Sequence, residues 1–388
     1  MGDCIKEYCV GCGLCSSVEG QLLKKDTRGF YYPEDTKSPF LKKICPASGI
    51  HTYYMDKNDI WGKNEKVYIG WSNNKALRNK ASSGGILTEL AAYALENNYV
   101  DTVMHTEVNS ISPTETVTTF SNSREELERK CGSRYSISHP LDKIGQLDKS
   151  KRYLFIGKPC DVITLRNYIS LNPEMKHVIP YMFSFFCAGL PSVTAQEKLL
   201  LKMGTSIEEC QSLKYRGDGW PGYATAKDFE GKIFKMEYRE AWGKTLGRDI
   251  MKACRICIDG IGEMADISCG DVWYLNDDET PDFGEHEGRN VIFSRTAVGT
   301  ELIKNAIRDK VIHVEDFPEY NEYLNKIQKY QYERKATMKV KLFVLKVLGR
   351  SVPAYDPKTM KQFSKAIDIR KQIRIAAGTL KRALNGKF

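Results

Sequence analysis

The chain has no run of about 18 consecutive apolar residues, which is the length that a single helix needs to cross a bilayer. Its first residues lack the apolar core of a secretory signal, and Lys6 stands where an N-myristoylation site has Ser or Thr. Neither the phosphate loop of nucleoside triphosphatases nor a GxGxxG dinucleotide fingerprint is present. We therefore expect a cytoplasmic protein without a membrane span or a standard nucleotide-binding loop.

Cysteine, in contrast, is abundant, with twelve residues in a chain of 388. Disulfide bonds rarely persist in a reducing cytoplasm. So many thiols in such a chain favour metal binding or redox chemistry.

The net charge of +9 is concentrated in one region. Residues 336–388 contain thirteen Lys and Arg residues against two Asp residues, a net charge of +11. The rest of the chain is nearly neutral, so we expect no nucleic-acid binding by the body.

We expect the basic tail, residues 336–388, to be helical. It either packs on the protein with a solvated basic face, docks onto an acidic partner, or lies peripherally on the inner membrane face. Apolar residues recur there at helical spacing through 339–350 and 358–384, including Phe363, Ile367, Ile373, Ala377, Leu380 and Leu384.

Strand-like and helix-like segments alternate between about residues 65 and 330. Strand patterns occupy 67–71, 100–106, 153–157 and 178–186, and helical patterns occupy 86–98 and 161–170. This alternation predicts an α/β (α+β) body in which helices cover a sheet. We divide the chain into regions 1–52, 65–150, 151–335 and 336–388.

The first region has the spacing of an iron–sulfur motif. Cys9-x2-Cys12-x2-Cys15 lets a tight loop surround one cluster and direct backbone N–H groups at the sulfurs. In bacterial ferredoxins the run continues with x3-Cys-Pro, and that fourth cysteine binds the other cluster. Here Glu19 occupies that place, and Cys45-Pro46 follows later.

Cys45 fits as the last cysteine of a second motif that has lost its other ligands, because Asp35, Ser38 and Leu41 stand at their positions. One complete ligand set remains. We predict a ferredoxin-like segment with one 4Fe-4S cluster, and a zinc knuckle is the alternative. Cys4 lies outside the motif. The predicted ligands are Cys9, Cys12, Cys15 and Cys45.

Four body cysteines form a second candidate metal site. Cys160 and Cys187 each follow an apolar strand, where ligands gather in open α/β sheets. Cys254-x2-Cys257 supplies a close pair. Three interpretations remain open: a second iron–sulfur cluster, a structural zinc site, and an activated nucleophile at Cys160. Cys269 is a possible substitute ligand, whereas Cys131 and Cys210 are interpreted as ordinary thiols.

A candidate anion site lies between a predicted strand and helix, at Ser82, Ser83, Gly84 and Gly85. Glycines let a phosphate approach the backbone, and a helix N-terminus offers free N–H groups. This pattern suits a flavin or nucleotide pyrophosphate, although Ser-Gly turns also cap helices for structural reasons. A second polar turn, CGSRY at 131–135, could contact a phosphate or a ring.

Together these residues resemble the coenzyme F-420 hydrogenase/dehydrogenase beta-subunit family, which includes 7-hydroxymethyl chlorophyll a reductase. The matching segments are NKASSGGILTELAAYAL, GSRY, IGKPCDVITLRNY, FFCAGLPS, YRGDGWPG and CRICIDGIGEMADISCGD. The resemblance implies an iron–sulfur flavoprotein that binds FAD in a mixed α/β flavin/substrate domain formed by 65–150 and 151–335. It also implies that the flavin contacts are Ser82, Ser83, Gly84, Gly85, Ser133 and Tyr135, and that the second-cluster ligands are Cys160, Cys187, Cys254 and Cys257.

Two positions depart from the family pattern. Lys158-Pro159-Cys160-Asp161 stands where the family usually has Thr-Pro-Cys-Gln, which puts the substrate in doubt. Cys269 stands where a small apolar residue is usual, which leaves the ligand assignment open by one cysteine. Similar members occur in bacteria that make no deazaflavin, often beside exopolysaccharide genes, so a deazaflavin substrate does not follow.

The expected function is that of a ferredoxin-linked, FAD-dependent reductase. Electrons would pass from ferredoxin, or a partner, through the clusters and FAD to a small organic substrate, with a place in polysaccharide biosynthesis. The alternative is a non-catalytic electron-transfer subunit of a larger hydrogenase or dehydrogenase. No general acid is identifiable, and the candidate proton donors are Asp161, His139 and Asp271.

Overall fold

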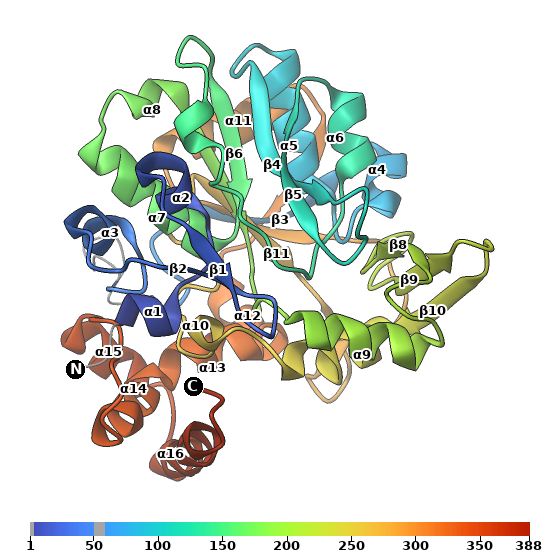
Figure 1. Cartoon of the computed structure of the whole chain (residues 1–388). Helices are drawn as coiled ribbons and strands as arrows, with labels where there is room; N and C mark the ends of the chain where they lie inside the picture. The colour runs from blue at the N-terminus through green and yellow to red at the C-terminus, as the bar shows by residue number, and fades with distance from the viewer. Residues whose placement is uncertain (1–3, 50–58) are drawn as a thin grey trace.

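The computed structural model describes residues 4–49 and 59–388, so the expected boundary at residue 52 lies outside the described residues. The body is built on one mixed sheet of eight strands (Figure 1), in the order β15-β3-β14-β11-β7-β6-β4-β5. This confirms the mixed α/β fold. The strands are β3 (Lys66–Ser72), β4 (Thr102–Val108), β5 (Thr116–Ser121), β6 (Tyr153–Gly157), β7 (Tyr181–Phe185), β11 (Ile267–Asp271), β14 (Asn290–Ser294) and β15 (Ile312–Asp316).

The centre of the sheet is parallel. Strands β4, β6, β7 and β11 are neighbours that run in one direction. Strand β3 has the same direction, because two antiparallel steps through β14 separate it from β11. The carboxyl ends of these strands therefore share one edge, which is where ligands bind in open α/β sheets.

Helices cover both faces of the sheet. On one face, α5 (Ile86–Glu96) and α11 (Ala297–Arg308) bury Leu90 and Ile303 against strand residues such as Leu154. On the other face, α7 (Pro159–Leu171) buries Val162 against residues such as Phe155. Adjacent residues of β6 thus enter opposite cores, as the two-residue period of a strand requires. Two shorter helices, α4 (Lys75–Lys80) and α6 (Arg124–Lys130), complete this part.

The N-terminal segment packs against the outside of α7. It consists of α1 (Cys4–Tyr8), α2 (Leu14–Glu19), β1 (Leu23–Lys25), β2 (Tyr31–Pro33) and α3 (Pro39–Ile44). Ser38 caps α3 by accepting a hydrogen bond from the Leu41 N–H at 3.2 Å. The Asn167 side chain on α7 donates to the Ile44 carbonyl at 3.1 Å, which fixes the chain immediately before Cys45.

A smaller unit projects from the body beside this segment (Figure 1). It contains a three-stranded antiparallel sheet and α9 (Val193–Met203), and Cys210 lies in its core. The short α8 (Met175–Val178) precedes β7, and α10 (Lys252–Arg255) precedes β11. The remaining strands are β8 (Cys210–Lys214), β9 (Tyr223–Asp228), β10 (Ile233–Glu237), β12 (Tyr274–Leu275) and β13 (Pro281–Asp282).

The C-terminal part is helical, but the helix expected over 358–384 is interrupted. The chain forms α15 (Pro357–Ser364) and then α16 (Ile369–Leu384), which Asp368 caps by accepting from the Lys371 N–H at 2.9 Å. The apolar positions therefore do not share one face: Phe363 is buried, whereas Ile373 is exposed. Three helices precede them, namely α12 (Tyr320–Ile327), α13 (Lys329–Ala336) and α14 (Met338–Val347).

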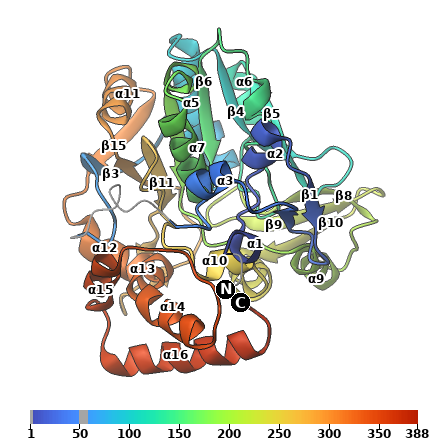
Figure 2. The ribbon, with the colours of Figure 1, turned by 60° about the vertical axis from the view of Figure 1, so that its left-hand side comes forward.

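Of these helices, α14 and α16 lie beneath the N-terminal segment and α10 (Figure 2). The Tyr355 hydroxyl donates to the Ile256 carbonyl at 3.0 Å, between two of the body cysteines. Among the residues that the structure describes, no helix combines the length and hydropathy that a bilayer span requires.

Candidate functional site

Cys9, Cys12, Cys15 and Cys45, the N-terminal quartet, surround one small cavity. All four are buried, in walls formed by residues such as Leu14. The Gly11 N–H donates to Cys9 Sγ at 3.3 Å. Near the other three sulfurs, the backbone N–H groups of Leu14, Ser16 and Ala47 oppose the rise in the thiol pKa. Such bonds stabilise thiolates and tune the potential of an iron–sulfur cluster.

Burial raises the pKa of all four thiols, and repulsion between neighbouring sulfurs adds to it for Cys9, Cys12 and Cys45. Thiolates in this cavity therefore need a cation beside them. The donor set, its burial and the N–H groups fit an iron–sulfur cluster.

The positions of the lost second-cluster ligands also meet in space. The Ser38 hydroxyl donates to the Glu19 carboxylate at 2.8 Å, and Ser38 caps the helix whose Leu41 is buried in the core. Two positions that would face one second cluster therefore contact each other directly. This contact supports the interpretation of the segment as a two-cluster module that has kept one ligand set.

Cys160, Cys187, Cys254 and Cys257, the body quartet, also come together. Cys160 lies in the first turn of α7, Cys187 follows β7, and the other two lie in α10 and just after it. Repulsion from the Cys187 and Cys257 sulfurs contributes to the raised pKa of Cys160 and of Cys254. Burial is the main cause, and it raises the pKa of Cys254 to about 12 and that of Cys257 to about 11.

These thiols do not resemble an activated nucleophile. Burial raises the pKa of Cys160 well above its ordinary value, although Lys158 opposes the shift. Nucleophilic cysteines have lowered pKa values instead. Within residues 4–49 and 59–388, no three Cys, His, Asp or Glu side chains converge closely enough for a single metal ion. A cluster holds its cysteines farther apart than a zinc ion does, because irons and sulfides lie between them.

Arg334 on α13 places a buried positive charge beside the body quartet. Its side chain is 4% exposed, and its nearby groups include Cys187 and Cys257. No carboxylate among the described residues forms an ion pair with it, and its Nε and Nη2 atoms have no hydrogen-bond partner there. One turn earlier, Gln331 donates to the Cys187 carbonyl at 3.1 Å. Neither role could be predicted from sequence, because both residues lie in a polar helical segment far from any cysteine motif.

Helix α7 connects the two quartets. Cys160 lies at its start, and the next residue, Asp161, is close enough to Cys12 to raise the pKa of that thiol. One turn further, Thr164 lines the N-terminal cavity and donates to the Cys160 carbonyl at 2.8 Å. The two cysteine quartets are therefore separated by little more than the first turn of one helix.

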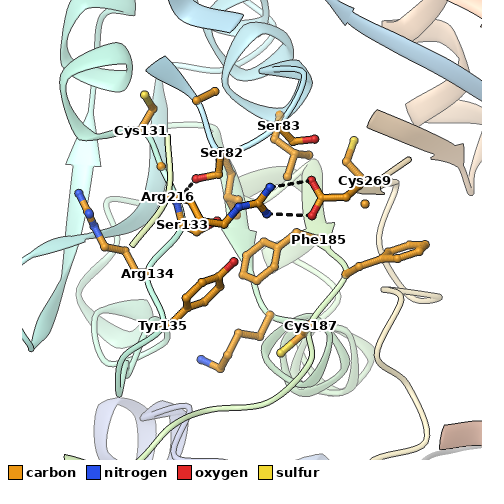
Figure 3. A pocket seen from close by; sticks show the side chains of 18 of the residues that line it. Ser82, Ser83, Cys131, Ser133, Arg134, Tyr135, Phe185, Cys187, Arg216 and Cys269 are labelled. Carbon is orange, nitrogen blue, oxygen red and sulfur yellow. Dashed lines mark hydrogen bonds and ion pairs between the residues drawn. The ribbon is translucent and has the colours of Figure 1, made fainter. Parts of the chain in front are cut away.

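A cavity of about 320 Å³ opens at the carboxyl edge of the sheet, beside the body quartet (Figure 3). Cys187 lines it, and so do Ser82 and Ser83 from the loop before α5. The Ser133 N–H donates to Ser82 Oγ at 2.7 Å, which joins the two predicted polar turns. This volume lies within the range of ligand-binding sites in proteins.

The flavin contacts predicted from the sequence occupy this cavity with one exception. Gly85 begins α5 with a φ of 79° and lines the cavity. Gly84 instead packs against Gly70 and Asn290, where a side chain would clash, and it is absent from the lining. Tyr135 forms an aromatic wall with Trp242, their ring centroids 4.7 Å apart.

The candidate proton donors have different environments. Asp161 lines the cavity, is fully buried and forms an ion pair with Lys158 at 2.8 Å; burial raises its pKa. Asp271 also lines the cavity, but its carboxylate is held by Arg216 at 2.8 Å. His139 is outside the lining and contacts the Gly11 carbonyl through Nδ1 at 2.7 Å.

Two of the remaining cysteines, Cys269 and Cys131, stand apart from the body quartet, whereas Cys4 lies close enough to Cys45 to contribute to its raised pKa. Cys269 lines the cavity from β11, and burial alone raises its pKa, without a contribution from another sulfur. Cys131 lines the cavity near Ser133, where Figure 3 shows it away from Cys187. The geometry thus gathers the four predicted body ligands and leaves Cys269 outside them.

Comparison with known families gives two adjacent matches. Residues 67–144 match the N-terminal part of the coenzyme F420 hydrogenase/dehydrogenase beta subunit, and residues 150–320 match its C-terminal part. Together they cover the sheet and the cavity.

Individual relatives are distant. The chain is 24% identical to the coenzyme F420 hydrogenase subunit beta of Methanosarcina barkeri, over 72% of this chain and 91% of that protein. It is 24% identical to the coenzyme F420-dependent sulfite reductase of Methanocaldococcus jannaschii, over 84% of this chain and 50% of that protein. It is 26% identical to the F420-dependent formate dehydrogenase subunit beta of the same organism, over 64% of this chain and 61% of that protein. These relatives are oxidoreductases or oxidoreductase subunits.

A similar fold occurs in a solved structure of the F420-reducing NiFe hydrogenase complex from Methanosarcina barkeri. The match has a TM-score of 0.57 and 22% identity, and it covers 74% of this chain and 96% of that one. At this identity the likeness concerns the fold.

Proposed function

This chain belongs to the coenzyme F420 hydrogenase/dehydrogenase beta-subunit family, and we propose that it is an iron–sulfur flavoprotein that carries electrons from reduced ferredoxin, or a partner subunit, to a small organic substrate. The N-terminal quartet would hold one 4Fe-4S cluster and the body quartet a second. FAD would occupy the cavity at the sheet edge. The substrate class that we favour is an intermediate of polysaccharide synthesis.

One observation carries this proposal: a single helix turn links the two cysteine quartets, and the cavity adjoins the second. Asp161 is close to Cys12, Thr164 lines the N-terminal cavity, and Cys160 belongs to the body quartet. Cys187 belongs to the body quartet and lines the large cavity. The three sites therefore lie in series.

The cofactors would supply the redox chemistry, since clusters carry electrons singly and a flavin converts between one-electron and two-electron transfer. The chain's own residues would bind and orient the cofactors and tune their reduction potentials. Ser82, Ser83 and the first turn of α5 offer hydroxyl and N–H donors to a phosphate. Tyr135 and Trp242 offer an apolar wall for a ring.

Charge around the body quartet is the second contribution of the protein. Lys158 is buried, and although burial opposes its charge, Asp161 together with the Cys160 and Cys187 sulfurs outweighs that effect and raises its pKa. Arg334 is cationic on the other side of the same thiols. Both charges favour the anionic state of a thiolate-ligated centre and therefore its reduction.

The test is anaerobic purification of the full chain followed by cofactor analysis. We expect a brown protein with about eight iron and eight sulfide per chain, as two 4Fe-4S centres require, and FAD released on denaturation. Reduced ferredoxin should then bleach the flavin absorbance. Zinc without iron would refute the cluster assignment, and iron without flavin would refute the assignment of the cavity.

A non-catalytic electron-transfer subunit is the second candidate. It is favoured by the printed names of the relatives, several of which are beta subunits, and by the structural neighbour, which is part of a hydrogenase complex. Gel filtration of the native protein from its own cells separates the two. A stable larger assembly, with no turnover by the isolated chain, would support the subunit.

A further inference from the structure

The last helix, α16, presents apolar side chains to solvent. Ile369, Ile373, Leu380 and Leu384 are 66%, 63%, 41% and 73% exposed. At 100° per residue their positions fall within an arc of about 60°, so they form one stripe along the helix. The stripe runs the length of a helix of 16 residues, about 24 Å.

The packing of α16 explains this exposure. The helix rests on α14 through small residues, and its buried positions are Thr379 and Ala383. A helix that docks by its large apolar residues would hide them in the core. Here the small face is inward and the large apolar face is outward, so the stripe does not stabilise the fold.

Basic residues border the stripe on the side away from the packed face. Arg370, Arg374 and Lys381 are exposed and fall within an arc of about 40° next to the apolar arc. Helix α16 contains five Lys and Arg residues and no acidic residue. Lys371 pairs with Glu333 behind the helix, at 2.6 Å. The outward surface therefore combines an apolar strip with basic side chains that form no ion pair within residues 4–49 and 59–388.

We propose that α16 docks this protein on an anionic lipid surface, with the apolar stripe among the acyl chains and the basic strip at the headgroups. An apolar stripe beside a Lys/Arg-rich face is the pattern of helices that lie in the membrane interface. Anionic headgroups complement the local charge. Figure 2 shows α16 along the outer margin of the molecule, where a flat surface can reach it. The proposal goes beyond electron transfer and does not depend on it.

The experiment is co-sedimentation of the full, anaerobically purified chain with vesicles. Vesicles of equal parts phosphatidylcholine and phosphatidylglycerol should bind the protein at low salt, and pure phosphatidylcholine should bind it at least about tenfold more weakly. Ile373→Ser with Leu380→Ser should reduce binding by about tenfold or more, since it removes apolar area from the stripe. Arg370→Gln with Arg374→Gln should reduce it and weaken its salt dependence.

A matched control is Ile111→Ser, which alters an apolar residue that is 91% exposed on a loop of the body. This variant should bind vesicles as the unaltered chain does. Equal binding by the Ile373→Ser/Leu380→Ser variant would overturn the proposal. The absence of binding to the anionic vesicles would also overturn it. A concentration-dependent dimer that the same variant abolishes would then identify a second copy as the occupant. Cofactor content, measured on each sample, tests the electron-transfer proposal separately.

Discussion

Replacing Arg334 by Met should lower the reduction potential of the centre at the body quartet. The guanidinium packs on the backbone of Gly260, where an added Cβ would lie 2.3 Å from Nη1. The Gly260 carbonyl accepts from the Cys187 N–H at 2.8 Å, which places the charge beside a predicted ligand. Met fills a similar volume without the charge, so the reduced, more anionic state loses a stabilising cation.

The size of the effect follows from Coulomb's law. At an effective dielectric constant of about 20 and a separation of roughly 8 Å, a unit charge contributes about 2 kcal/mol. Since about 59 mV corresponds to a tenfold change for one electron, the midpoint potential should fall by about 90 mV. Arg334→Lys keeps the charge and should shift the potential much less.

The assay is an anaerobic redox titration followed by electron paramagnetic resonance. The centre at Cys9, Cys12, Cys15 and Cys45 serves as an internal reference, because it is held by other residues and its potential should not move. Iron content is measured in parallel. A body-quartet potential that is unchanged in Arg334→Met, with iron retained, would refute the reasoning. If Arg334→Met loses iron, Arg334→Gln, which also removes the charge, replaces it in the comparison with the unaltered chain and Arg334→Lys.

Three further changes test other parts of the structure. Cys257→Ala should halve the iron to about four per chain, the content of one 4Fe-4S centre, whereas Cys269→Ala should retain about eight; equal loss in both would contradict the ligand assignment. Burial, assisted by Lys130, lowers the pKa of His105 from 6.5 to about 4. As the pH falls, the unfolded chain binds a proton at His105 before the folded chain does. The folding free energy that this difference protects is fully present above about pH 6.5, and about 3 kcal/mol of it is lost as the pH falls toward 4. The His105→Gln variant should not lose this stability when its thermal unfolding is measured between pH 6.5 and pH 4. Stability that falls equally with pH in the variant and the unaltered chain would contradict this prediction. Lys335→Met should destabilise the protein by about 3–5 kcal/mol, because it leaves the buried Glu263 carboxylate without the Lys335 ammonium that lies 2.5 Å from it. An unchanged free energy of unfolding in urea would contradict this prediction.

Much of the fold could be predicted from local pattern. Strands such as Tyr153–Gly157 and helices such as Ile86–Glu96 carry the periods of a buried strand and an amphipathic helix, so their elements were correct to within a few residues. The helix predicted over 358–384 was wrong in its continuity. The first helix ends at Ser364, and Asp368 provides the N-cap that starts a second one, a local signal that spacing alone did not weigh.

The glycine loop shows a second limit. The Ser-Gly sequence predicted a turn at a helix start, and Gly85 meets that prediction with a left-handed φ. The sequence could not tell which glycine lines the cavity and which packs against a neighbouring strand. Gly84 was assigned to the flavin site, yet it is packed against Gly70, which is remote in sequence.

By itself, the sequence determined the chemistry available to this protein: which thiols could bind metal, how the first motif is spaced, and where the positive charge is concentrated. These properties depend on residue types and short separations. Tertiary structure alone decided how they are connected. Only folding places Cys160 in the body quartet and Thr164 beside the N-terminal quartet, because α7 packs between the sheet and the N-terminal segment. Only folding leaves Arg334 buried beside Cys187, and only the choice of packing face leaves Ile373 exposed on α16. Such contacts depend on which surfaces exclude water together, and no local pattern records that.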